Sequence, residues 1–188
     1  MSDYVNPCKV ITGPTTRWSY VNVWDPKSIN GGTPKYSVSL IIPKTDTETI
    51  RKIQDAIQAA YREGENKLRG NGKSVPALED LKTPLRDGDR DRKDDPAYAG
   101  CMFINANSAT APGIVDASLN PIIERSEVYS GVYGRASITL YAFSSNGNRG
   151  IACGLNNLQK IRDGESLGSR SRAEDDFTAY SRDDDFLA

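Results

Sequence analysis

Hydrophobic and polar residues alternate along several short stretches of this chain, which is the pattern of β-strands that bury one face. In the stretch KYSVSLII (35–42), every second residue is large and apolar, and Pro43 ends the run. An Asn-Gly pair at 146–147 favours a tight hairpin turn. Five stretches are therefore predicted to be strands: 17–24, 35–42, 101–107, 128–143 and 151–155.

One segment has the three- and four-residue apolar spacing of a helix instead. The apolar side chains of residues 50–61 fall on one helical face, and Thr45 and Glu48 before them have the spacing of a capping box. Gly64 predicts the C-terminal end of this helix. A shorter amphipathic helical turn is predicted within 155–164 from the spacing of its leucine and isoleucine residues.

The order of these elements predicts the fold class and the domain organisation. Residues 65–97 are polar and rich in turn signals, so we expect a long loop with at most short helical pieces. About five strands, one inserted helix and this loop predict a mainly β, OB-fold-like five-stranded barrel, with a β-sandwich as the alternative. We expect this domain to span residues 1–168 and a flexible acidic tail to follow at 169–188.

Composition argues against several classes of protein. The chain has 188 residues and no histidine, which removes the commonest general base and the commonest zinc ligand. Its three cysteines lack CxxC spacing and are expected to be reduced core thiols. No apolar run is long enough for a transmembrane helix, and the first residues lack the pattern of a signal peptide. We therefore expect a non-enzymatic cytosolic protein with no cofactor, no metal site and no membrane partner.

The strand predicted at 128–143 carries the clearest functional signal. Its aliphatic residues occupy even positions, so its odd positions, which hold three tyrosines, a phenylalanine and an arginine, face away from the core. Such a face can stack nucleobases and neutralise phosphates. The same parity argument in 17–24 and 101–107 places further rings outward. One groove is thus expected to bring together ten nucleic-acid contacts: Arg17, Trp18, Tyr20, Lys44, Lys73, Phe103, Tyr133, Arg135, Tyr141 and Arg149.

The net charge of −1 conceals an asymmetry along the chain. Residues 173–188 contain six acids and one base, so they carry −5 and leave +4 on residues 1–172. A basic body favours an anionic ligand. The tail shares repeated negative charge and a stackable ring with single-stranded DNA, so we expect it to compete with DNA for the groove. Once displaced, four tail residues are expected to bind partner proteins: Asp183, Asp184, Asp185 and Phe186.

Four motifs resemble a known family: PLRDGD (84–89), DDPAYAGCMFINA (94–106), GVYGRASITLYAF (131–143) and NGNRGIACGLNNLQKIRDGESLG (146–168). This family comprises bacteriophage OB-fold single-stranded-DNA-binding proteins, formerly a domain of unknown function, and the resemblance spans about residues 7–168. It implies the OB-fold, sequence-tolerant binding of single-stranded DNA, no cofactor, and a role in phage replication, recombination or repair in the host cytoplasm.

The acidic tail is also similar in plan to that of the replicative single-strand binders of short-tailed phages. In those proteins the tail recruits polymerase and helicase-primase. The likeness therefore implies phage or host replication proteins as partners of the tail. Whether the chain forms a homo-oligomer is left open by the sequence.

Two other functions remain open at this point. A phage structural or assembly protein would use the same aromatic faces as subunit interfaces. A metal-dependent nuclease would need converging carboxylates, for which Asp87, Asp89 and Asp91 are the candidates. The calcium-loop pattern fails there, because Arg92 stands where glycine is needed and Tyr98 where glutamate is needed.

Overall fold

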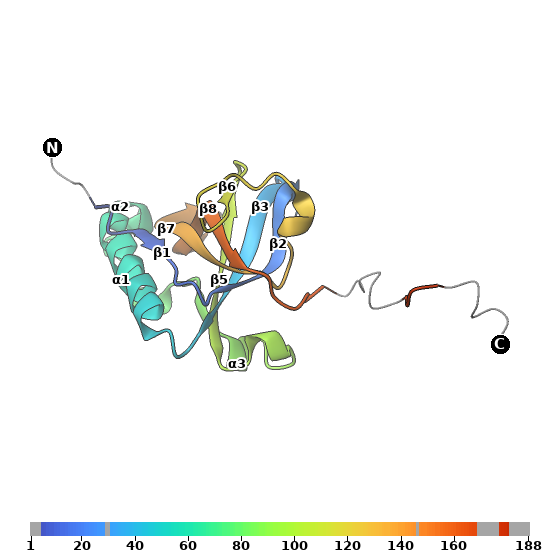
Figure 1. Cartoon of the computed structure of the whole chain (residues 1–188). Helices are drawn as coiled ribbons and strands as arrows, with labels where there is room; N and C mark the ends of the chain where they lie inside the picture. The colour runs from blue at the N-terminus through green and yellow to red at the C-terminus, as the bar shows by residue number, and fades with distance from the viewer. Residues whose placement is uncertain (1–4, 29–30, 146, 169–176, 181–188) are drawn as a thin grey trace.

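The computed structural model describes residues 5–28, 31–145, 147–168 and 177–180 (Figure 1). The strands are β1 (Lys9–Ile11), β2 (Arg17–Lys27), β3 (Lys35–Pro43), β4 (Leu85–Asp87), β5 (Cys101–Ser108), β6 (Gly113–Val115), β7 (Tyr133–Ser145) and β8 (Asn148–Arg162). The helices are α1 (Thr47–Glu63), α2 (Glu65–Arg69) and α3 (Gly88–Asp91), with single 3-10 turns at Leu78–Asp80, Pro96–Tyr98 and Arg125–Glu127. Among the described residues, no helix combines the length and apolarity needed to cross a membrane.

Five of these strands close into a ring. β2 pairs with β3, β3 with β5, and β7 with both β2 and β8, all antiparallel. The ring closes where β5 and β8 run parallel at the pair Asn107 and Gly154. This strand order is that of the OB-fold, whose second and third strands correspond here to β3 and β5. The structure therefore confirms the predicted OB-fold-like barrel with one main helix inserted after the second barrel strand.

Alternate residues of the ring fill the barrel with aliphatic side chains. Its fully or almost fully buried members include Val38, Leu40, Ile42, Ile104, Ala106, Ile138, Leu140, Leu155 and Leu158. The helix α1 packs beside β1 and β7 (Figure 1) and buries the predicted apolar face, including Ile53 and Ile57. It begins one residue later than the capping-box pattern predicts, because Asp46 accepts the hydrogen bond from the Thr49 amide, and it ends at Gly64 as expected.

The sequence placed Trp18 on the outer face, and this prediction is wrong. Trp18 is fully buried, and its indole Nε1 donates to the Gly134 carbonyl at 3.1 Å. The pairing of β2 with β3 shifts register between Ser19 and Asn22, and Tyr20 at this bulge has a φ of 47°. A bulge inserts a residue and changes the alternation. Trp18 before it and Val23 after it therefore both face the core, although their parities differ.

The prediction that Phe103 is available for stacking is also wrong. Its side chain does lie outside the barrel, but it is fully buried in a small second cluster with Ile41 and Tyr98. The rings of Phe103 and Tyr98 meet edge to face, with centroids 5.0 Å apart. Strand parity gives the side of the sheet, but it cannot show that residues 96–98 cover that side.

The helical turn predicted within 155–164 is part of the long strand β8 instead. Asn157 pairs with Ser137 and Leu155 with Ile138, which leaves Asn156 as an extra residue in β8. The bulge brings both Leu155 and Leu158 to the core side despite their three-residue spacing. A strand with such a bulge imitates helical spacing in the sequence.

Candidate nucleic-acid interface

A groove of about 890 Å³ lies on the outer surface of β2, β3 and β5. Its floor consists of outward-facing polar residues of β3 and β5, because the intervening positions face the core. The β2–β3 connection supplies one wall, and Ser145, beside the β7–β8 hairpin turn, reaches the same groove. In OB-folds, the face of strands 2 and 3 and these two loops form the usual surface for oligonucleotides.

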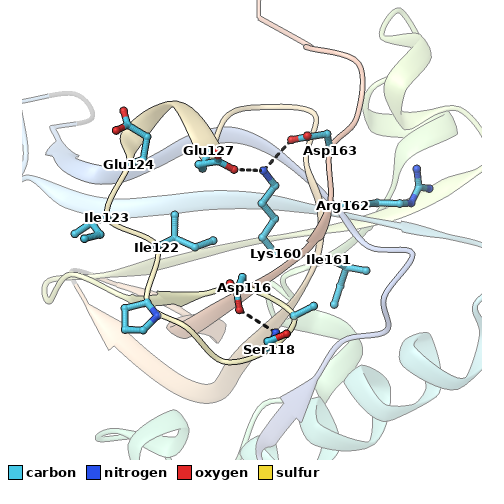
Figure 2. Close-up of a pocket in the computed structure, with 12 residues that line it drawn as sticks. Asp116, Ser118, Ile122, Ile123, Glu124, Glu127, Lys160, Ile161, Arg162 and Asp163 are labelled. Atoms are coloured by element: carbon cyan, nitrogen blue, oxygen red, sulfur yellow. Dashed lines mark hydrogen bonds and ion pairs between the residues drawn. The ribbon is translucent and has the colours of Figure 1, made fainter.

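The charges of the groove favour an anion. Its described lining includes Lys27, Lys35 and Arg92, and none of the lining residues is acidic. A second cavity of about 590 Å³ beside the end of β8 differs in this respect (Figure 2). There Lys160 bridges Glu127 at 3.0 Å and Asp163 at 2.8 Å. Because that cavity has more carboxylates than cations in its lining, it is less suited to a polynucleotide.

Tyr20 and Arg92 form a ring–cation pair at the groove. The Tyr20 side chain is 57% exposed, and the Arg92 guanidinium lies 5.9 Å from its ring centroid. The same guanidinium lies 5.7 Å and 6.0 Å from the buried rings of Phe103 and Tyr98. Among the described residues, Arg92 has no carboxylate partner. The buried rings thus position a cation whose charge is available to a ligand.

The backbone at Tyr20 supports a functional role. A φ of 47° is in the left-handed region, which non-glycine residues seldom adopt. Such conformations cost about 1–3 kcal/mol and cluster at ligand-binding sites. Here the bulge turns Tyr20 outward while Trp18, two residues earlier, stays in the core.

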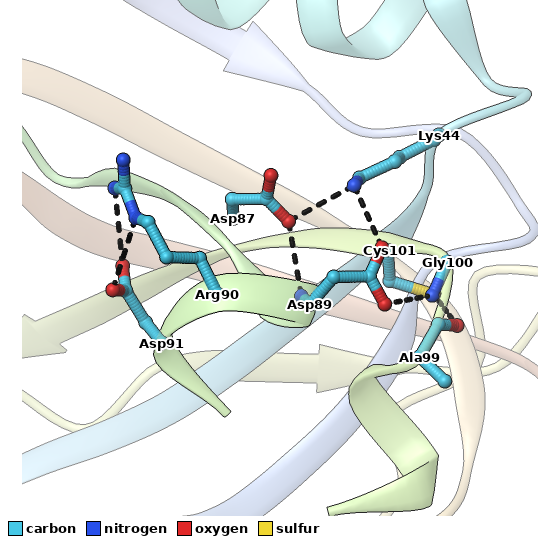
Figure 3. Close-up of polar contacts among 8 residues, drawn as sticks. All are labelled: Lys44, Asp87, Asp89, Arg90, Asp91, Ala99, Gly100 and Cys101. Carbon is cyan, nitrogen blue, oxygen red and sulfur yellow. Dashed lines mark hydrogen bonds and ion pairs between the residues drawn. The ribbon is translucent and has the colours of Figure 1, made fainter. Parts of the chain in front are cut away.

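Residues 87–100, called here the α3 segment, are fixed to the barrel by polar contacts (Figure 3). Lys44 lies between Asp87 at 2.9 Å and Asp89 at 2.7 Å, and Asp89 also accepts from the Gly100 amide at 2.9 Å. The Tyr98 hydroxyl donates to Ser39 Oγ at 2.9 Å. The contacts with Lys44 and Ser39 hold the α3 segment, and with it Arg92, against the outer face of β3 and β5, and the Asp89–Gly100 bond stabilises the segment internally.

The ion pairs of the α3 segment change the role expected for Lys44. Hydrogen bonds that Lys44 donates to Asp89 and Asp87 raise the pKa of Lys44, and the same bonds lower the pKa of both carboxyl groups. All three groups are charged at neutral pH, so the lysine is already neutralised. Asp91 pairs with Arg86 at 3.2 Å. Within the part of the chain that the structure describes, no three acidic or thiol side chains converge as metal ligands.

The three predicted contact residues of β7, Tyr133, Arg135 and Tyr141, do not line the groove. Their orientation follows the predicted parity, and Tyr141 is 42% exposed. Tyr141, however, lines a separate cavity of about 410 Å³ beside α1 and α2. The Tyr133 ring packs against the guanidinium groups of Arg17 at 5.1 Å and Arg162 at 3.8 Å. Arg135 Nε donates to Gln159 Oε1 at 2.8 Å.

The remaining predicted cations have other partners or positions. Arg17 donates to the carbonyls of Gly131 at 3.1 Å and Glu165 at 2.6 Å, and Arg149 donates to the Leu68 carbonyl at 3.0 Å. Lys73 is exposed in the loop after α2. Of the ten predicted contacts, only Tyr20 is among the described residues that line the groove. The single groove expected from the sequence does not unite the other nine.

The groove residues that the sequence argument missed are mostly polar: Asn22, Lys27, Lys35, Ser37, Ser39, Arg92, Asn105 and Asn107. A signal for them exists in the sequence. Two strands that follow one another in the barrel, 35–42 and 101–107, both place serine or asparagine at alternate outward positions. A search for aromatic residues alone overlooks this repeated polar face.

Residues 8–187 match the family described as Enterobacter phage Enc34, ssDNA-binding protein. The chain belongs to this family. A curated relative, protein p50 of Acyrthosiphon pisum secondary endosymbiont phage 1, is 27% identical over an alignment of 179 residues that covers 92% of this chain and 95% of p50. The match confirms the resemblance to phage single-stranded-DNA-binding proteins, and the Enc34 family is one of binding proteins and not of enzymes.

Two solved structures share the fold of this Enc34-family chain. The single-stranded-DNA-binding protein of bacteriophage Enc34, in complex with ssDNA, has a TM-score of 0.72 at 24% identity, over 89% of this chain and 97% of that one. The single-stranded-DNA-binding protein gp2.5 of bacteriophage T7 has a TM-score of 0.57 at 14% identity, and the match covers 89% of this chain and 91% of gp2.5. The family match extends beyond the predicted domain end at residue 168, into the predicted tail at 169–188.

Proposed function

We propose that this chain binds single-stranded DNA in the groove over β2, β3 and β5. One observation carries the proposal: the OB-fold face of β3 and β5 has three cations and no described carboxylate in its lining. A cation-rich groove that follows the sugar–phosphate backbone is the usual basis of binding without sequence preference. Family membership supports the same ligand.

In this proposal each part of the groove meets a different part of the strand. Lys27, Lys35 and Arg92 neutralise phosphates at the rim. Tyr20 stacks on one base, and its exposed ring tolerates any base because every base has a π face. Binding of this kind protects unpaired DNA during phage replication or recombination.

A fluorescence anisotropy titration with labelled oligo-dT tests the proposed function. Affinity should fall with salt, with a slope of log K against log salt of about −2 for three neutralised phosphates. Absence of binding at about 50 mM salt would favour the assembly-protein interpretation. Metal-dependent degradation of the oligonucleotide would favour the nuclease.

The C-terminal tail is proposed to compete with DNA for this groove. Its predicted partner-binding residues, 183–186, lie outside the described residues. The segment before the tail is fixed near the groove: the Leu167 amide donates to the Ser130 carbonyl at 2.8 Å. The Leu167 side chain packs against the cluster of Ile41, Tyr98 and Phe103, whose two rings position Arg92. Leu167, just before the tail, therefore packs on the same cluster as Arg92, one of the proposed phosphate-binding cations.

Deleting residues 173–188 is expected to raise the affinity for oligo-dT. The gain should be largest at about 50 mM salt and small at about 0.5 M, because exposed charges are screened at high salt. Anisotropy titrations of both chains at both salt concentrations measure it. A matched variant, in which the six tail acids are changed to amides and Phe186 is retained, separates the effect of the tail's charge on DNA affinity from the effect of its aromatic ring. Unchanged or weaker binding by the truncated chain rules out competition.

A further inference from the structure

The floor of the groove is a two-by-two array of small polar side chains. In the pairing of β3 with β5, Ser37 lies opposite Asn107 and Ser39 lies opposite Asn105. All four residues line the groove, and we call them the amide floor. Residues two apart on a strand are roughly 7 Å apart, so the amide floor has room for one or two bases.

The hydrogen bonds of the amide floor leave it open to a ligand. Ser39 is only 4% exposed, and its Oγ accepts from the Tyr98 hydroxyl at 2.9 Å. Ser37 is half-buried, and its Oγ accepts from Asn22 Nδ2 at 3.4 Å, so its own proton stays available to a ligand. The side chains of Asn105 and Asn107 hydrogen-bond to no other described residue. Each amide therefore offers two donor hydrogens and one acceptor oxygen to the groove.

The rest of the groove indicates which part of a polynucleotide meets this floor. Phosphate oxygens only accept hydrogen bonds, and the cations Lys27, Lys35 and Arg92 in the lining suit them. Base edges both donate and accept, as the amide floor does. Tyr20 is the one aromatic ring among the described lining residues, so stacking alone gives the bases little contact.

We infer that the amide floor hydrogen-bonds the Watson–Crick edges of unpaired bases, an inference that rests on the proposed function. Those edges are accessible in a single strand and occupied in a duplex, so the contact selects unpaired strands. It remains tolerant of sequence, because an amide can present either its donor or its acceptor after rotating about its side chain. Asn105 and Asn107 are the residues that carry this selection.

The test compares oligo-dT with an oligonucleotide of N3-methylthymidine, which keeps the backbone and ring but lacks the N3 donor. The full-length wild-type chain should bind the methylated probe about tenfold more weakly, the loss expected for one or two hydrogen bonds. The double variant Asn105→Ala/Asn107→Ala should bind oligo-dT about tenfold more weakly and bind both probes equally. Its melting curve should match wild type, because neither side chain packs in the core.

Two controls complete the comparison. Asn66→Ala changes an exposed asparagine on α2, outside the groove, and should keep wild-type affinity and discrimination. Tyr20→Ala should weaken both probes by the same factor, because a methylated ring still stacks. Equal binding of the two probes by the wild-type chain overturns the amide-floor inference while leaving salt-dependent DNA binding standing. Failure of both probes to bind overturns the proposed function itself.

Discussion

Replacing Tyr20 by alanine is expected to weaken oligo-dT binding about five- to a hundredfold, while the free energy of unfolding changes little. Alanine removes the stacking platform, which contributes about 1–3 kcal/mol per stacked base. The side chain is more than half exposed, so its removal leaves no cavity in the core. Anisotropy titration gives the affinity, and urea unfolding gives the stability.

Two variants serve as controls for this result. Tyr20→Phe keeps the ring and should keep most of the affinity. Tyr141→Ala removes the other exposed tyrosine ring of the barrel, which lines the cavity beside α1, and should bind as wild type does. If Tyr141→Ala lost affinity and Tyr20→Ala did not, DNA would bind on β7 and not in the groove over β2, β3 and β5.

Replacing Trp18 by alanine is expected to lower the free energy of unfolding by about 3–5 kcal/mol, the usual cost of deleting a large buried ring. The indole is fully buried and its Nε1 donates to Gly134. It packs so closely on Gly134 that a Cβ at that position would overlap the ring. The change in the midpoint of urea unfolding at constant slope measures the effect.

The control for Trp18 distinguishes a core residue from a ligand contact. Trp18→Phe keeps an aromatic ring in the core and should cost less stability than alanine does. At temperatures where the alanine variant stays folded, its oligo-dT affinity should approach wild type. A variant that kept its stability and lost DNA binding would return Trp18 to the interface, where the sequence pattern had placed it.

Much of the barrel could be predicted from local patterns. The alternation in 35–42 and the helical spacing in 50–61 correspond to β3 and α1 in the structure. The wrong predictions concern segments that contain β-bulges. An extra residue at Asn156 gave β8 a helix-like leucine spacing, and the bulge at Tyr20 reversed the parity that placed Trp18 outside. Bulges depend on pairing with a distant strand, so single-strand alternation does not predict them.

The site was less predictable than the fold, because it depends on which outward faces share one side of the barrel. The parity of β7 was right, but β7 is a neighbour of β2 and β8, whereas the groove lies over β2, β3 and β5. Which strands share one outer surface is determined only when the ring of strands closes, and the sequence of a single strand does not contain that information.

Charge pairing in the α3 segment was equally hidden in the sequence. Residues 86–95 mix acids and bases, and their order alone does not indicate which of them form ion pairs. In the structure Asp87 and Asp89 pair with Lys44, and Asp91 pairs with Arg86 and Arg90. Because these carboxylates pair with other cations, the Arg92 guanidinium contacts the rings of Tyr20, Tyr98 and Phe103 instead. A long-range contact with Lys44 thus determines which arginine is available to a ligand.

The location of bound DNA on the barrel tests the assignment of the groove most directly. Backbone amide NMR spectra of the nitrogen-15-labelled chain, titrated with oligo-dT, report that location residue by residue. If DNA binds in the groove, the largest shift changes occur in the amide floor and at Tyr20 and Arg92. If the largest changes occurred at Tyr133, Arg135 and Tyr141 on β7 while the amide floor stayed unchanged, the assignment of the groove would be contradicted.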